Sequence, residues 1–95
     1  MKISILLPYK ENFSPEYPGA VSLFVYETSK ISRYKKSITV FGNTNYSKKF
    51  DINYRNIELK KSLLSSQTRN YVKKFIDIEK KNNSSIIEVH NRPSY

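Results

Sequence analysis

The sequence predicts an α/β fold: a partial Rossmann-like domain in which helices cover both faces of a parallel sheet, in three layers. Three observations predict it. Short apolar runs of strand length alternate with two longer stretches that carry apolar residues at helical spacing. The first run, at 2–7, is nearly continuous, as is typical of strands buried on both faces, and the last, with Ile86, Ile87 and Val89, is short and β-branched, as is typical of a strand buried in a sheet. With 95 residues, the chain is long enough for one small domain with a modest core.

The first third of the chain predicts a strand, a loop and a helix. The strand is Lys2–Leu7, and residues 9–17 form a polar loop whose glutamates, Glu11 and Glu16, are expected to face solvent. Pro18 opens the helix, because a proline in the first turn has no N–H that would lack a partner. The apolar face of this helix is expected to include Val21, Phe24, Val25, Thr28 and Ile31, and the helix fades over 33–36.

The rest of the chain predicts three strands and a second helix. The strands are Ser37–Phe41, Arg55–Leu59 and Ser85–Val89, with a turn at 42–45 and no assignment for 46–54. Ser65 or Ser66 caps the second helix, which ends over 80–83 because asparagine tolerates the left-handed conformation of a helix terminus. The buried face of this helix is expected to include Tyr71, Val72, Phe75 and Ile76.

The element order β-α-β-β-α-β, with right-handed crossovers, predicts the strand order 3-2-1-4. The sheet then has a switch point between the first and fourth strands, where open α/β sheets bind ligands. This topology brings the loop before Gly19 next to the segment His90-Asn91-Arg92, which follows the fourth strand. The fourth strand keeps an open apolar edge, which is a liability in a complete protein. We therefore expect residues 1–95 to be the first part of a longer domain.

The composition argues against disulfides, metal sites and membrane-spanning segments. There is no cysteine, so no disulfide and no thiolate metal site is expected. With a single histidine and eight acidic residues, no structural metal site is expected either. The N-terminal apolar run is too short for a secretory signal, and no run has the roughly 20 residues of a membrane span. A cytoplasmic location is expected.

The net charge of +9 comes mostly from lysine pairs that are dispersed along the chain. We rank a solvated basic surface first and specific nucleic-acid binding third. Between them we place a weak attraction to phosphate or to anionic lipid, which would include an association with the inner face of a membrane.

The arrangement resembles the start of the N-terminal domain of a GT-B-fold glycosyltransferase of the large retaining group classed as family four. Three features carry the resemblance: a first strand ending in Leu7-Pro8, a helix opened by Pro18-Gly19-Ala20-Val21, and a last strand running into Glu88-Val89-His90-Asn91-Arg92-Pro93. The resemblance covers nearly all of this chain and about half of such an N-terminal domain. It does not cover the C-terminal domain, whose paired glutamates hold the nucleotide sugar.

The resemblance implies a set of site residues. A Gly-Gly pair of the family lies near the donor phosphates and the acceptor, and it matches Gly19-Ala20, with alanine in place of the second glycine. A histidine of the family lies beside the transferred sugar, and it matches His90, the catalytic candidate. Asn91 and Arg92 are the remaining substrate-binding candidates, since arginine pairs with phosphate through two parallel hydrogen bonds. No cofactor and no metal are implied.

We therefore expect the N-terminal fragment of a glycosyltransferase that moves a sugar from a nucleotide-sugar donor to an unknown acceptor, inactive as 95 residues alone. The alternative is a small basic module that binds RNA or an anionic surface, with its eight tyrosines and five phenylalanines as stacking platforms. A third hypothesis, another Rossmann-like nucleotide-binding domain, lacks the spaced-glycine fingerprint. A lone histidine on a loop is also often only a solvated residue.

Overall fold

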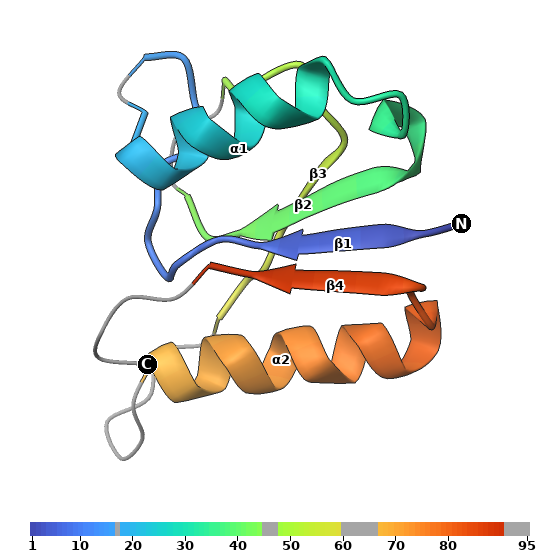
Figure 1. The fold of residues 1–95 in the computed structure, drawn as a ribbon. Helices are drawn as coiled ribbons and strands as arrows, with labels where there is room; N and C mark the ends of the chain where they lie inside the picture. Colours follow the sequence, from blue (N-terminus) through green and yellow to red (C-terminus); the bar gives the residue numbers. More distant parts are fainter. Residues whose placement is uncertain (17, 45–47, 60–66, 91–95) are drawn as a thin grey trace.

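The computed structural model describes residues 1–16, 18–44, 48–59 and 67–90, and these form a parallel sheet with two helices (Figure 1). The strands lie in the order β3-β2-β1-β4, and each neighbouring pair is parallel. The elements in chain order are β1 (Ile3–Leu6), α1 (Ala20–Lys30), the 3-10 helix η1 (Lys35–Ser37), β2 (Ile38–Gly42), β3 (Tyr54–Asn56), α2 (Gln67–Asn82) and β4 (Ile86–Val89). The predicted fold class and the strand order 3-2-1-4 are confirmed.

The two helices cover opposite faces of the sheet, so the molecule has three layers (Figure 1). Successive residues of a strand point to opposite faces of the sheet, so β1 contributes side chains to the core under α1 and to the core under α2. Ile5 and Leu7 pack with Val25 of α1, whereas Leu6 packs with Tyr71 of α2. The hydroxyl of Tyr71, which is fully buried, donates a hydrogen bond of 2.6 Å to the carbonyl oxygen of Leu7. This bond fixes the start of α2 to the end of β1.

The third strand lies earlier than the sequence predicts, at Tyr54–Asn56 and not at 55–59. Its partner β2 ends at Gly42, opposite Asn56, so no backbone remains to pair with the following residues. The N–H of Ile57 still donates to the Gly42 carbonyl at 2.7 Å, and the Ile57 side chain is then buried under α2. The apolar residues beyond Asn56 therefore pack into the core and do not extend the strand pairing with β2.

Four residues predicted on the buried faces of the helices are exposed, and these predictions are wrong: Thr28 and the three residues named next. Phe24 is 59%, Ile31 80% and Ile76 48% exposed. Ile31 is only the C-cap of α1, because the helix ends at Lys30. The Ser32 hydroxyl accepts a hydrogen bond from the Tyr34 N–H at 3.0 Å, which offers the backbone an alternative to further helix. The end of α2 follows the prediction, since Asn83 adopts a positive φ of 55°. The predicted caps Ser65 and Ser66 lie outside the described residues.

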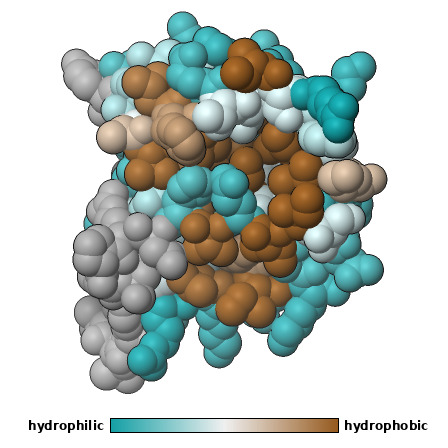
Figure 2. All heavy atoms as spheres, in the orientation of Figure 1, coloured by the Kyte–Doolittle hydropathy of each residue, from teal (hydrophilic) through white to brown (hydrophobic). Residues whose placement is uncertain are grey.

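The edge strand β4 is half exposed along its length, although its sequence predicts a buried strand. Apolar side chains gather around β4, between the two helices (Figure 2). They include Phe24, Ile76, Ile86, Ile87 and Val89. Among the described strands β4 pairs only with β1, so its other edge has no strand beside it. The open apolar edge expected from the sequence is therefore present among the described residues.

A buried carboxylate joins α2 to β1 at the amino end of the sheet. Oε1 of Glu79 accepts a hydrogen bond of 2.5 Å from the Ser4 hydroxyl, and Ser4 lies 2.7 Å from the Ser84 hydroxyl. Burial acts to raise the pKa of Glu79, but the hydrogen bonds from Ser4, Ser84 and Asn82 together outweigh it and hold the pKa below its ordinary value of 4.5.

This lowered pKa predicts a loss of stability in acid. The unfolded chain binds a proton at Glu79 more readily than the folded chain, so the free energy of unfolding falls as the pH drops below 4.5 and through the folded-state pKa. In Glu79→Gln that part of the loss should vanish, while Glu16→Gln, an exposed control, should keep it. Urea unfolding at a series of pH values measures this, and equal acid slopes in all three proteins would refute it.

Candidate functional site

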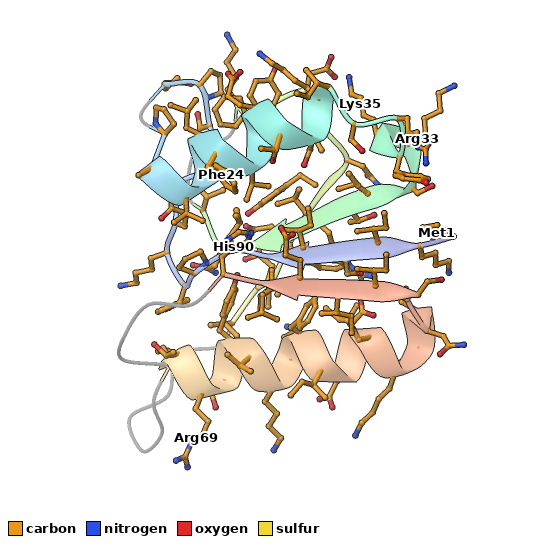
Figure 3. All side chains as sticks on the ribbon, in the orientation of Figure 1. Met1, Phe24, Arg33, Lys35, Arg69 and His90 are labelled. Atoms are coloured by element: carbon orange, nitrogen blue, oxygen red, sulfur yellow. The ribbon has the colours of Figure 1, made fainter. Side chains whose placement is uncertain are left out.

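The carboxyl ends of β1 and β4 meet beside the first turns of α1. The N–H of His90 donates to the Leu6 carbonyl at 3.0 Å, which continues the β1–β4 pairing to the last residue before the undescribed terminus. The imidazole lies edge-on to the ring of Phe24, with 6.2 Å between ring centroids (Figure 3). His90 and α1 are thus neighbours, as the predicted strand order requires.

Glu88 positions the imidazole of His90. In the β1–β4 register Glu88 pairs with Ile5, whose side chain faces α1, so Glu88 and, two residues on, His90 share that face. Nε2 of His90 lies 2.7 Å from Oε2 of Glu88, and because an ionised carboxylate only accepts, Nε2 carries the proton. The His90 side chain is 23% and that of Glu88 53% exposed, so the pair stands at the surface with its imidazole half-buried.

The N-terminus of α1 already holds a carboxylate. Oε2 of Glu11 accepts a hydrogen bond of 3.0 Å from the N–H of Ser22, one of the donors that a helix start leaves without a helical partner. The negative charge also suits the positive end of the helix dipole. Glu11 is only 7% exposed, so the expectation that it faces solvent is wrong, whereas Glu16 is exposed as expected.

A tight turn after β1 carries Glu11 to this position. The N–H of Glu11 donates to the Pro8 carbonyl at 3.1 Å, and Lys10 inside the turn takes a positive φ of 64°. The Gly19 N–H then donates to the Asn12 carbonyl at 3.3 Å, which holds the loop against the start of the helix. The sequence shows no glycine or asparagine at position 10 to signal such a turn.

Gly19 makes room for the Glu11 carboxylate. As the N-cap of α1 it has φ −69° and ψ 160°, a conformation that any residue adopts. A Cβ added at Gly19, however, would collide with the carboxylate of Glu11. Glycine is therefore needed here for space, and in this structure the space next to the Gly19 and Ala20 backbone is occupied by the protein's own anion.

Polar side chains join the loops at the same end of the sheet. Asn56 Oδ1 accepts a hydrogen bond of 2.9 Å from the Thr44 N–H, and the Thr44 hydroxyl lies 3.4 Å from Oδ1 of Asn12. These three residues have no signal in the sequence, because single Asn and Thr residues in loops form no pattern. Of the predicted site residues, the structure brings Gly19 and Ala20 to the same end as His90. Asn91 and Arg92 lie outside the described residues.

Comparison of the chain with protein-family models, with curated proteins and with solved structures finds no match. Among residues 1–16, 18–44, 48–59 and 67–90, no three His, Asp or Glu side chains gather into a group that could hold a metal ion. Neither helix of this described part is long and apolar enough to cross a membrane.

Proposed function

We propose that these residues form the first part of the acceptor-side domain of a glycosyltransferase, which moves a sugar from a nucleotide-sugar donor to an acceptor. One observation carries the proposal: His90, held by Glu88, meets α1 at the switch point of a 3-2-1-4 parallel sheet. Ligands of open α/β sheets bind in that position. Because such folds serve many functions, the proposal depends on this site and on the resemblance around Pro18–Val21 and His90.

His90 is the proposed catalytic residue. With Nε2 donating to Glu88, the imidazole presents its other edge, with Nδ1, to a sugar hydroxyl. A hydrogen bond that becomes stronger as charge develops on the transferred sugar would lower the barrier. Glu88 is a positioning residue, since it acts by fixing the orientation of the imidazole and its protonated nitrogen.

The carboxylate of Glu11 determines which part of the donor can bind next to the N-terminus of α1. A phosphate placed at the N–H groups of Gly19 and Ala20 would face the Glu11 carboxylate, and like charges at this range repel. Sugar or acceptor hydroxyls, which can donate to a carboxylate, suit this position better. In our proposal Arg92 pairs with the phosphates, and the base is held by a C-terminal domain.

The proposal places the protein in the cytoplasm, with a weak association with the inner membrane face through its net charge of +9. Specific nucleic-acid binding is not part of it. Residues 1–95 alone should transfer no sugar, because catalysis of this kind needs donor and acceptor held together in one closed cleft.

NMR titration of the isotope-labelled chain tests the proposal. Nucleotide sugars at millimolar concentration should shift the signals of His90, Phe24 and Ser22, and the matching nucleotides without sugar should shift them less. Shifts confined to other residues would contradict the proposal. Tight, sequence-selective RNA binding at physiological salt would instead put the RNA-binding alternative first.

A further inference from the structure

A cavity of about 520 Å3 opens at the amino end of the sheet. It is lined by the starts of β1 and β2, by β3 and by the turn between α2 and β4. Met1, at this end, and His90 lie at opposite ends of the strands (Figure 3). The cavity is therefore separate from the site proposed for sugar transfer. Its volume is within the range of clefts that hold small ligands, about 300–1,000 Å3.

The side-chain charges that line this cavity are all positive. Lys2, Lys36 and Arg55 reach it from the start of β1, from η1 and from β3, and the described lining contains no Asp or Glu. Nζ of Lys2 donates to the carbonyl oxygen of Asn82 at 3.2 Å, which holds this ammonium group at the end of α2. Three cations from three separate elements thus face one hollow, where their potentials add.

Hydroxyl and amide groups complete the lining with hydrogen-bond donors. Nδ2 of Asn53 donates to the Thr39 hydroxyl oxygen at 2.9 Å, and both residues line the cavity. Because the Thr39 oxygen already accepts this hydrogen, its own O–H can donate to a ligand. The carboxylate of Glu79 lies behind one part of the lining, where it accepts hydrogen bonds from Ser4, Ser84 and Asn82, so these three donors are already engaged.

This set of groups matches phosphate. Arginine pairs with phosphate oxygens through two parallel hydrogen bonds, and lysine adds point charges that need no fixed geometry. A neutral sugar would leave the cations without a counter-charge, and a cation would be repelled.

We propose that the cavity binds the phosphate group of a small ligand, with Lys36 and Arg55 as its main contacts and Lys2 and Thr39 beside them. Two sources share this chemistry, a free phosphorylated metabolite and the headgroup of an anionic phospholipid. The site is independent of the proposed sugar transfer, since it lies at the other end of the sheet.

NMR titration with inorganic pyrophosphate tests the proposal on the unmodified chain. The amide signals of Lys36, Thr39 and Arg55 should shift with saturation, while those of His90 and Phe24 stay in place. Shifts spread evenly over the lysine-rich surface, or none at all, would overturn the proposal. Shifts at His90 alone would mean that pyrophosphate binds at the proposed sugar site and would overturn the proposal of a phosphate cavity. The two proposals can therefore be refuted independently.

Two charge-matched variants separate a local site from net charge. Lys36→Gln with Arg55→Gln removes two cations from the cavity, and Lys73→Gln with Lys81→Gln removes two exposed cations from α2. The first pair should weaken pyrophosphate binding by on the order of tenfold or more, because it removes two charged hydrogen-bond donors, and the second should change it little. Equal losses in both would overturn the proposal. Thermal unfolding confirms that both variants fold.

Vesicles identify the source of the phosphate. If a lipid headgroup is the ligand, vesicles of phosphatidylcholine with phosphatidic acid should bind the unmodified chain and the Lys73→Gln, Lys81→Gln variant. They should not bind the Lys36→Gln, Arg55→Gln variant. Pyrophosphate binding without such vesicle binding assigns the cavity to a free metabolite. Vesicle binding that is equally weakened in both variants, without pyrophosphate binding, would refute a phosphate site.

Discussion

Replacing Gly19 with alanine should destabilise the protein by about 0.5–2 kcal/mol, the cost of losing a helix cap, because the end of the Glu11 side chain has to move away. The backbone does not cause this loss, because φ −69° and ψ 160° at Gly19 suit alanine. The cause is the carboxylate of Glu11, with which the new Cβ would collide. To escape it, Glu11 would have to give up its hydrogen bond to the Ser22 N–H and leave the start of α1 uncapped. Urea unfolding measures the change.

A double-mutant cycle with Glu11→Ala isolates this collision. Glu11→Ala alone should cost about 0.5–2 kcal/mol, as the loss of a helix cap does. In that background Gly19→Ala should be nearly neutral, so the two losses are strongly non-additive. Glu16→Ala, a change of an exposed glutamate in the same loop, should stay within about 0.5 kcal/mol of the unchanged protein. Additive losses at Gly19 and Glu11 would show that Glu11 does not occupy the start of the helix.

The second large effect concerns His90 in a longer protein that contains this domain and transfers sugar. His90→Ala should lower kcat on the order of 10-fold to 1,000-fold with little change in KM, because the lost hydrogen bond forms fully only in the transition state. The fold should survive, since the imidazole stands at the end of an edge strand, 23% exposed. Unchanged kcat would reduce His90 to a surface residue.

Glu88→Gln provides the matching test of positioning. The amide can still accept from Nε2 of His90 but no longer attracts it by charge, so kcat should fall by less than in His90→Ala. Asp51→Asn, which changes an exposed carboxylate to an amide on another loop, is the control and should leave kcat unchanged. A loss at Glu88 larger than at His90 would mean that the carboxylate, and not the imidazole, contacts the substrate.

The sheet was predictable because its signals are local and agree with one another. Apolar runs set β1 and β4, helical spacing set α1 and α2, and the preference for right-handed crossovers then left one simple strand order. The meeting of His90 with α1 followed from that order alone. The bounds of β3 did not, because they depend on where its partner β2 ends, at Gly42.

The burial of Glu11 could not be predicted, because it depends on a turn with no sequence signal and on a contact with Gly19, eight positions further along the chain. A glutamate in a polar loop is usually solvated, and only the coincidence of the turn at Lys10 with the missing Cβ of Gly19 buries this one. Phe24 was misplaced for a related reason. Its helical spacing predicts that it faces the sheet. Its ring instead contacts His90, at the end of the open edge strand β4, where it is 59% exposed.

The central claim, that sugar is handled between α1 and His90 at the carboxyl end of the sheet, is tested most directly by a crystal structure of the chain soaked with a nucleotide sugar. We predict density for the sugar ring within hydrogen-bond distance of the His90 imidazole and next to the first turn of α1, with Glu88 still holding Nε2. A nucleotide sugar bound elsewhere on the molecule, or a carboxyl end left unoccupied at saturating ligand, would contradict the account.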